Sequence, residues 1–190
     1  MDPLRRRPKL IAGCDAAFDN NLAIGVVVIM LYPQLNILES VRRERQVRFP
    51  YIPGLLTFRE GLVLLDCFRA LHHAPDVILF DGQGMAHFRM LGLATHLGIL
   101  LNKPSIGCAK SRLTGTHEKV GPQRGAYAMI KNSKSEIIGM VLRTKDHVKP
   151  VFISAGYRII LQEAKRIVLT STQGFRLPEP LRQADHLTRS

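Results

Sequence analysis

Two β-branched, apolar runs open the chain, at residues 11–18 and 22–32. Asp19-Asn20-Asn21 separates them, a strong signal for a hairpin turn. Residues 35–48 continue as a third strand, which Pro50 ends because proline cannot extend a strand's hydrogen bonding. The first fifty residues therefore predict a meander of three strands.

Helical and strand-like patterns then alternate along the rest of the chain. Helices are predicted over residues 57–71, 89–100 and 158–169 and from residue 181 onward, and strands over residues 76–80, 105–109, 136–143 and 150–154. Residues 110–135 are predicted as a basic, glycine-rich loop. A meander followed by such alternation indicates an α/β protein with a mixed sheet and helices packed on it. No repeat or boundary divides the sequence, so residues 1–190 are expected to form one domain.

Charge is the most informative part of the composition. The 190 residues are 46% hydrophobic, as in ordinary globular proteins, but 27 Lys and Arg oppose 15 Asp and Glu, a net charge of +12. Basic residues cluster over residues 5–9, 42–48 and 110–112. This balance favours a polyanionic partner, and basicity that serves only solubility or an unusual host is the alternative.

Several classes of protein are disfavoured. The longest apolar run, residues 22–32, is too short to span a membrane, and the N-terminus lacks the apolar core of a signal peptide, so a cytoplasmic location is expected. Cys14, Cys67 and Cys108 are odd in number and widely spaced. They predict buried thiols rather than disulfides or a zinc site.

Three acidic residues occupy positions that require an explanation. Asp15 lies inside the first apolar strand, Asp81 ends the strand over residues 76–80, and Asp185 lies in the last helix. At 100° per residue Asp185 falls about 40° from the buried Leu181, whereas His186 faces outward at about 140°. Backbone amides could satisfy each carboxylate singly. Carboxylates that converge in a basic protein instead indicate a cation such as Mg²⁺, and so a metal-dependent nuclease.

Two interpretations remain open for Glu60, and two for Lys110. Glu60 either closes a capping box with Thr57 or projects toward the active edge of the sheet. Lys110 ends the strand over residues 105–109 as Asp81 ends its own strand, and it either neutralises a phosphate or is simply solvated.

Six segments together resemble the Endonuclease V family. They are AGCDAAF (residues 12–18), PYIPGLLTFRE (50–60), DGQGMAH (81–87), LGLATHLG (91–98), PSIGCAKSRL (104–113) and RLPEPLRQAD (176–185). The resemblance covers nearly the whole chain in order. It implies an RNase H-like fold, with a mixed central sheet flanked by helices. It also implies a Mg²⁺-dependent DNA-repair endonuclease, with Mn²⁺ able to substitute, that cuts one nucleotide 3′ of a deaminated base such as deoxyinosine.

The resemblance also assigns roles to residues. Asp15, Asp81 and Asp185 would bind the metal, Glu60 would join this acidic cluster as a catalytic residue, and Lys110 would act near the scissile phosphate. The segment PYIP (residues 50–53) would act as a wedge that enters the duplex, and neighbouring loops would line a pocket for the extruded base, the base pocket. The nucleic-acid contacts would therefore be Pro50, Tyr51, Ile52, Pro53, Gly82, Gln83, Gly84, His87, Ile106, Gly107, Ser111 and Arg112.

Some features depart from the family pattern. Phe88 follows His87 where the family has proline, Tyr157 replaces a frequent histidine, and the chain begins almost at the first strand. Three alternatives remain beside the DNA enzyme: an inosine-specific ribonuclease, a non-catalytic nucleic-acid-binding module, and a junction-cutting, dimeric resolvase. The partner is expected to be DNA with deaminated bases or inosine-containing RNA, without a membrane, and the protein is expected to be a monomer.

Overall fold

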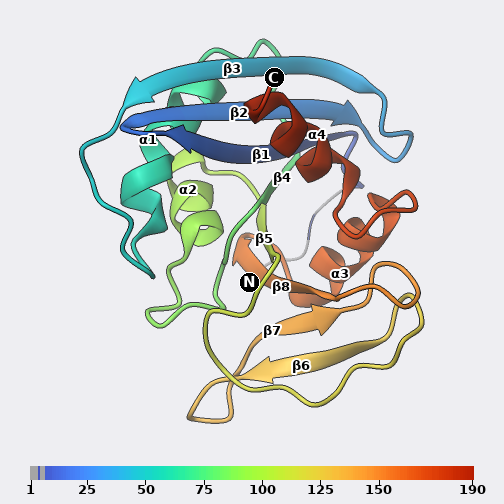
Figure 1. Ribbon diagram of the computed structural model, residues 1–190. Coiled ribbons are helices and arrows are strands. Elements are labelled where there is room, and N and C mark those ends of the chain that lie inside the picture. Colours follow the sequence, from blue (N-terminus) through green and yellow to red (C-terminus); the bar gives the residue numbers. More distant parts are fainter. Residues whose placement is uncertain (1–3, 5–6) are drawn as a thin grey trace.

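One mixed sheet organises the computed structural model, which describes Leu4 and residues 7–190 (Figure 1). Its strand order is β3-β2-β1-β4-β5-β8-β7-β6. The strands are β1 (Leu10–Asp19), β2 (Leu22–Leu31), β3 (Ile37–Gln46), β4 (Val77–Phe80), β5 (Ser105–Ala109), β6 (Tyr127–Lys131), β7 (Ile137–Leu142) and β8 (Val151–Tyr157). The helices are α1 (Leu56–Arg69), α2 (Leu93–Leu101), α3 (Leu161–Thr170) and α4 (Glu179–Thr188).

The pairing confirms the predicted meander and mixed sheet. β1, β2 and β3 pair antiparallel, β4 then lies parallel to both β1 and β5, and β8 returns antiparallel to β5. The connections between parallel strands carry α1 and α2, as crossovers of this kind usually do.

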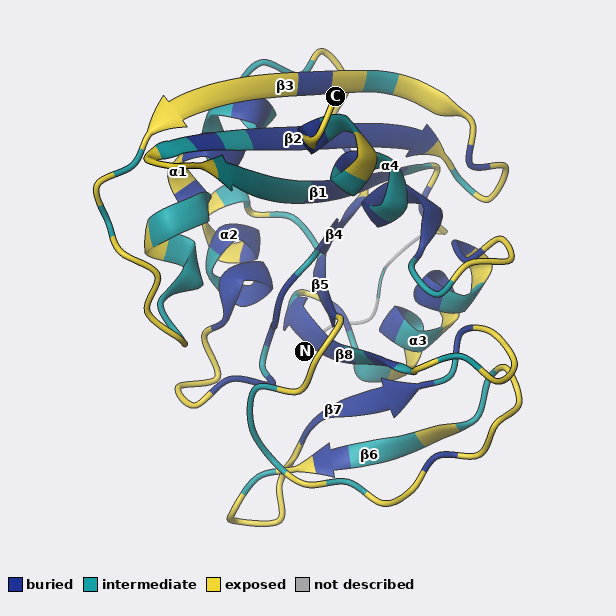
Figure 2. Cartoon of the chain, in the orientation of Figure 1, coloured by how far each residue is buried: buried dark blue, intermediate teal, exposed yellow. Residues whose placement is uncertain are grey.

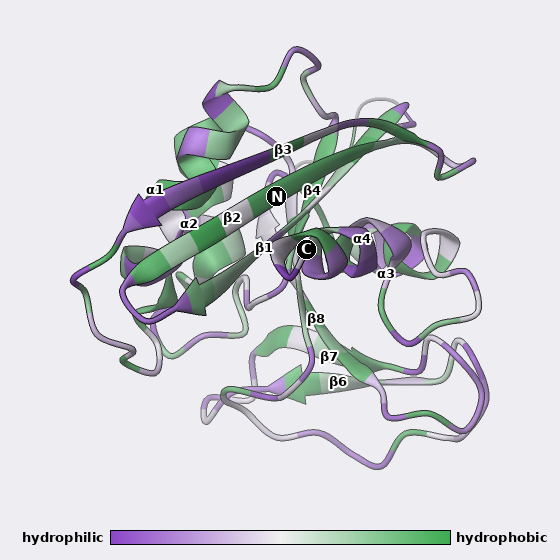
Figure 3. Cartoon of the chain, turned by 45° about the horizontal axis from the view of Figure 1, so that its top comes forward, coloured by the Kyte–Doolittle hydropathy of each residue, from purple (hydrophilic) through white to green (hydrophobic). Residues whose placement is uncertain are grey.

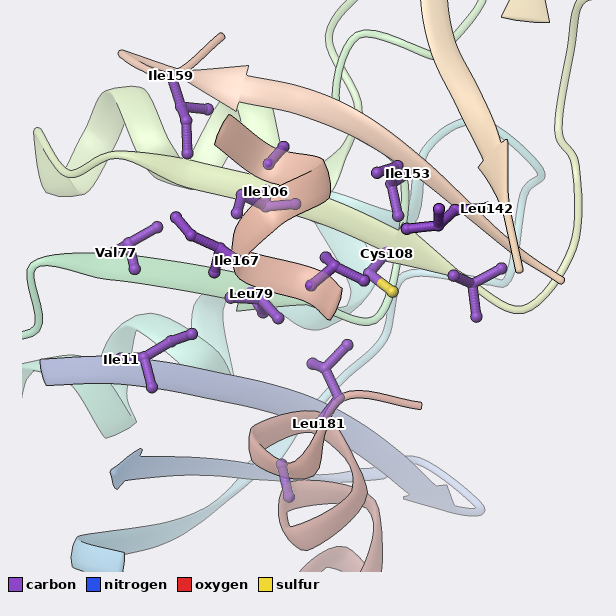
Figure 4. Close-up of a cluster of buried hydrophobic side chains, with 14 of the residues drawn as sticks. Ile11, Val77, Leu79, Ile106, Cys108, Leu142, Ile153, Ile159, Ile167 and Leu181 are labelled. Atoms are coloured by element: carbon purple, nitrogen blue, oxygen red, sulfur yellow. The ribbon is translucent and has the colours of Figure 1, made fainter. Parts of the chain in front are cut away.

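Helices cover both faces of the sheet, and each face has its own hydrophobic core (Figure 2). Because successive side chains of a strand point to opposite faces, Ile11 belongs to the core under α3 and α4, whereas Ala12 belongs to the core under α1 and α2. Figure 4 shows Ile167 of α3 and Leu181 of α4 directed at the strand residues of the first core. The three cysteines are buried and free, as predicted.

One missed strand and three helix starts correct the sequence-based prediction. β6 was missed, because its five residues pair with β7 at the sheet edge and carry little alternation of their own. α2 begins at Leu93 because Met90 has a φ of 52°, and α3 begins at Leu161 because Arg158 has a φ of 49°, both incompatible with a right-handed helix. α4 begins at Glu179, two residues earlier than predicted, with Pro178 as its N-cap.

The capping box, one of the two interpretations of Glu60, does not form. The N-cap of α1 is Leu55, which makes no side-chain capping bond, so Thr57 already lies within the first turn. Gly54, with a φ of 83°, ends the preceding loop early enough for the helix to start there. Glu60 is therefore free of a capping role.

The edge strand β3 is strongly hydrophilic toward its C-terminal end (Figure 3). Its Arg42 pairs with Glu44 and its Arg45 with Asp66, so part of this basic cluster is neutralised. Charged side chains on an edge strand also oppose pairing with other sheets. Arg5 and Arg6 of the N-terminal basic cluster lie outside the described residues. Within the described part of the chain no helix is long and apolar enough to cross a membrane.

Candidate active site

The register between two parallel strands brings the first two carboxylates together. Cys14 of β1 lies opposite Phe80 of β4, so the next residues, Asp15 and Asp81, are neighbours at the same edge. The Asp81 amide donates to the Cys14 carbonyl at 3.3 Å, which continues the strand pairing by one residue. The sheet itself therefore aligns these two side chains.

The third carboxylate comes from α4, which packs against β1. The backbone of Pro180 lies so close to Gly13 that a Cβ on this glycine would be 2.2 Å from the Pro180 carbonyl carbon. This close approach brings Asp185 toward the sheet edge. Asp185 is mostly covered and His186 is exposed, as the helical spacing predicted.

Asp15, Asp81 and Asp185 form a cluster that could hold a metal ion. One oxygen of each lies within 4.8 Å of the others. Burial raises the pKa of Asp15 to about 7, with the nearby Asp81 carboxylate as the next cause. Hard carboxylate oxygens that repel one another in this way are the donor set that a divalent cation such as Mg²⁺ satisfies.

Lys110 brings a positive charge into this cluster. Its Nζ lies 2.6 Å from Asp81 Oδ2 and 3.3 Å from Asp185 Oδ1. Burial alone would lower the pKa of Lys110, but Asp81 and Asp185 outweigh burial and hold this pKa above its usual value. The ammonium group thus stands in for a cation among the three carboxylates, so the residues present fit a metal.

Glu60 lies beside this cluster without belonging to it. The three residues whose oxygens lie within 4.8 Å of one another do not include Glu60. Burial raises the pKa of Glu60 well above its usual value, and the charges of Asp15 and Asp81 raise it further. The influence of the Asp15 and Asp81 charges on Glu60 favours the second of its two interpretations, a side chain near the active edge.

A pocket of about 300 Å³ opens next to the carboxylates. Asp81 and Lys110 of the charged cluster line it, as does His87. Six of the predicted nucleic-acid contacts line it: Tyr51, Gly82, Gln83, His87, Ser111 and Arg112. The volume reaches the lower limit of typical small-ligand sites, which suits a single flat group.

Other predicted contacts lie elsewhere. Ile106 is fully buried in the core, because the alternation of β5 points it away from the pocket, so it is a core residue. Gly84 and Gly107 lie beneath the pocket, where a Cβ on Gly107 would be 2.3 Å from the Gly84 nitrogen. Pro50, Ile52 and Pro53 lie in the exposed loop before α1, outside the lining of this pocket.

His87 ties the two pocket loops together. Its Nδ1 accepts from the Arg89 amide at 3.2 Å, so Nε2 carries the proton and donates to the Gly54 carbonyl at 2.9 Å. The same loop is fixed underneath, where the Gly84 amide donates to Ser154 Oγ at 2.8 Å. The pocket is therefore largely preformed.

Two residues at the site were not predicted from the sequence. Arg189 binds Asp185 Oδ1 at 2.9 Å, and its i,i+4 spacing on α4 could have revealed this pair. Gly13 matters through its contact with Pro180, which no sequence pattern signals. Tyr157, in contrast, lies at the end of β8, where its hydroxyl faces Asn102, and does not line the pocket.

Comparison with known proteins agrees with this geometry. The family model described as Endonuclease V matches residues 1–186. The chain belongs to the Endonuclease V family. Enzymes of this family are metal-dependent nucleases of DNA repair, and the fold is RNase H-like.

Individual members of the Endonuclease V family are similar over most of their length. A curated Endonuclease V from Dehalococcoides mccartyi is 48% identical over 177 residues, which cover 92% of this chain and 79% of that protein. The crystal structure of Endonuclease V from Streptomyces avermitilis superposes with a TM-score of 0.93 at 38% identity, covering 99% of this chain and 83% of that one.

A third similar structure contains nucleic acid. It is Endonuclease V from Ciona intestinalis in complex with a 24mer DNA that contains an inosine followed by a ribo-adenosine. Its TM-score is 0.82 at 28% identity, over 96% of this chain and 85% of that one.

Proposed function

We propose that this protein is a Mg²⁺-dependent endonuclease that cuts DNA one nucleotide to the 3′ side of a deaminated base, deoxyinosine in particular. The observation that carries the proposal is the cluster of Asp15, Asp81 and Asp185 beside a pocket that can hold one extruded base. Membership of the Endonuclease V family supports the same activity.

Asp15, Asp81 and Asp185 would hold the metal ion. Mg²⁺ prefers a few carboxylates together with water and phosphate oxygens, and Mn²⁺ accepts similar ligands. When bound, the ion supplies an activated water and charge stabilisation at the leaving oxygen. Arg189, which binds Asp185, orients that carboxylate.

Lys110 and Glu60 carry the remaining catalytic roles. Lys110 leaves its carboxylate partners and neutralises a nonbridging oxygen of the scissile phosphate. Glu60, once it is ionised, accepts the proton that the attacking water loses, because a carboxylate with a raised pKa is a stronger base than an ordinary one.

The pocket and the loop before α1 select the lesion. A mispaired base leaves the stack at lower free-energy cost than a paired one, which already favours deoxyinosine. Tyr51 is 66% exposed between two prolines, a rigid apolar group suited to unstacking a base step. Pro50, Ile52 and Pro53 form the same wedge, while Gly82, Gln83, Ser111 and Arg112 surround the extruded base.

One domain and one copy of the chain suffice for this function. All of these residues come from β1, from the loops that follow β3, β4 and β5, and from α1 and the α4 segment of one chain. We therefore propose that residues 1–190 act as a single domain and as a monomer.

A second candidate is cleavage of inosine-containing RNA. The specific observation in its favour is that the Ciona relative binds an inosine followed by a ribonucleotide. A 2′-hydroxyl beside the scissile phosphate is what would separate the two substrates.

One experiment tests both candidates. Matched strands that carry deoxyinosine, inosine in RNA, or no modified base are incubated with Mg²⁺ and the wild type, Asp81→Ala or the control His186→Ala. We expect the wild type and His186→Ala to cut only the modified strands, Asp81→Ala to cut none, and product lengths to match a cut one nucleotide 3′ of the lesion. Equal cutting of all strands, or an active Asp81→Ala, would refute the proposal. The ratio of DNA to RNA rates decides between the two candidates.

A further inference from the structure

A second groove begins where the base pocket ends. His87 lines both, and from His87 the groove runs between Phe88 and Met90 on one side and the turn after β6 on the other. Its volume is about 520 Å³. Asp81 and Lys110 line the base pocket but not this groove, so the groove continues the site away from the metal cluster.

Phe88 forms an exposed aromatic rim on this groove. Its side chain is 65% exposed, and Met90 beside it is 38% exposed. The loop that carries them is held rigidly, because Met90 donates from its amide to the His87 carbonyl at 2.9 Å and Ala86 is buried against β6 and β7. The backbone of Met90 has a positive φ of 52°, a conformation that costs free energy unless the surroundings fix it. The backbone around Phe88 is therefore held in place while the ring itself is exposed to solvent.

The opposite wall of the groove is basic, and its backbone is also held in place. Lys131 and Lys134 line it, and among the described residues neither has an ion-pair partner. Glu136, the acidic residue of this wall, accepts from the Asn132 amide group at 2.7 Å. The backbones of Thr116 and Lys131 pair with each other, which fixes the wall to the loop beside the base pocket.

We propose that this groove binds the single strand on the 5′ side of the lesion, with a base stacked on Phe88 and phosphates beside Lys131 and Lys134. An exposed ring opposite unpaired lysines is the arrangement that binds single-stranded nucleic acid without sequence preference. The 5′ polarity rests on the proposed function. If the carboxylates take the phosphate 3′ of the lesion, the strand that leaves past His87 is the 5′ one.

Substrate length tests the proposal. The KM for cleavage is measured on deoxyinosine strands that keep a fixed 3′ side and carry zero, two, four or eight nucleotides on the 5′ side. A second series varies the 3′ side only. The proteins are the wild type, Phe88→Ala, the double variant Lys131→Ala/Lys134→Ala, and two controls of matched exposure, Leu100→Ala and Lys145→Ala/Lys149→Ala. Melting curves verify that each variant is folded.

We expect the wild-type KM to fall about tenfold as the first four 5′ nucleotides are added, the effect of one stacked base. The ratio of the KM without 5′ nucleotides to the KM with four is then about two or less in Phe88→Ala. In the double lysine variant the KM depends less strongly on salt. Both controls keep the wild-type ratio and salt dependence. A wild-type ratio in Phe88→Ala, or an effect on the 3′ series instead, would overturn the proposal.

Failure of the proposed function can be told apart from failure of the groove. A wild type that cuts neither series refutes the cleavage proposal. The groove is then tested by fluorescence anisotropy of labelled, unmodified single strands. Weaker binding by Phe88→Ala than by Leu100→Ala supports the groove, and equal binding refutes it.

Discussion

The ammonium group of Lys110 lies 2.6 Å from Asp81 and 3.3 Å from Asp185, between two carboxylates of the candidate metal site. A metal ion at this cluster and this side chain therefore compete for the same carboxylates. Lys110 stabilises the metal-free cluster and must turn away when a cation enters. In the absence of a metal ion, the ammonium group of Lys110 thus balances part of the negative charge of Asp81 and Asp185.

Replacing Lys110 by methionine should separate metal binding from catalysis. Without the ammonium group the carboxylates repel one another, so we expect Mg²⁺ to bind more tightly and to raise the melting temperature more than in the wild type. Cleavage of deoxyinosine strands should fall about 10²–10³-fold, because a charge aimed at the phosphate is lost. Calorimetric Mg²⁺ titration and cleavage rates check the two effects, and unchanged cleavage would remove Lys110 from the reaction.

A second prediction concerns the contact between Gly13 and Pro180. An alanine Cβ at residue 13 would lie 2.2 Å from the Pro180 carbonyl carbon, so α4 must shift off β1 in Gly13→Ala. We expect a loss of stability of about 1–3 kcal/mol and a weaker Mg²⁺ affinity although all three carboxylates remain. The control is Gly121→Ala, where the nearest atom to the new Cβ is 3.5 Å away. Wild-type Mg²⁺ affinity in Gly13→Ala would contradict this account of how Asp185 reaches the site.

Part of this site could be predicted from the sequence because the sheet determines it. A buried strand that ends in Asp81 beside a strand containing Asp15 requires only parallel pairing in the right register to bring the two acids together. The contribution of α4 could not be derived in this way. The position of Asp185 depends on the close approach of Pro180 to Gly13, a packing contact between residues far apart in the sequence.

Local signals misled the prediction where tertiary contacts override them. Thr57 and Glu60 have the spacing of a capping box, but the loop ends at Gly54 and the N-cap of α1 is Leu55. Glu60 is instead buried where the charge of Asp15 acts on it. β6 was missed because its pairing with β7 stabilises a segment that has weak strand character alone. Ile106 resembles the family motif, yet the alternation of β5 directs it into the core.

Glu60→Gln distinguishes a catalytic carboxylate from a structural one. Burial and the charges of Asp15 and Asp81 raise the pKa of Glu60, so ionising it is unfavourable and a neutral amide should not destabilise the fold. We expect an unchanged or higher melting temperature together with an about 10²–10⁴-fold loss of cleavage rate, the range for general-base catalysis. A variant that retains the wild-type rate would show that Glu60 only supports the cluster.

His87→Ala should uncouple the two loops of the base pocket. The substitution removes the bonds to the Gly54 carbonyl and the Arg89 amide, at a cost of about 1–3 kcal/mol. Because the loop before α1 is then no longer held to the loop after β4, we expect the preference for deoxyinosine over unmodified strands to fall at least fivefold. The measurement is kcat/KM on both strands, and His96→Ala, a half-buried histidine of α2, is the control. Equal losses on both strands would argue against a role in recognition.

Glu39 gives the protein a pH-dependent stability that is independent of the active site. The backbone amide of His72 is the main cause that lowers the pKa of Glu39 to about 2, and the His73 and His72 rings and the His73 amide add to it. In the unfolded chain this pKa returns to about 4.3. The ionised side chain therefore stabilises the fold fully above that value, and the contribution disappears as the pH falls toward 2.

We expect Glu39→Gln to melt about 2–4 °C below the wild type at pH 6–7, with a difference that shrinks steadily between pH 5 and pH 3. Glu44→Gln, which removes an exposed pair with Arg42, should show no comparable trend. A difference for Glu39→Gln that stays constant with pH would refute this assignment.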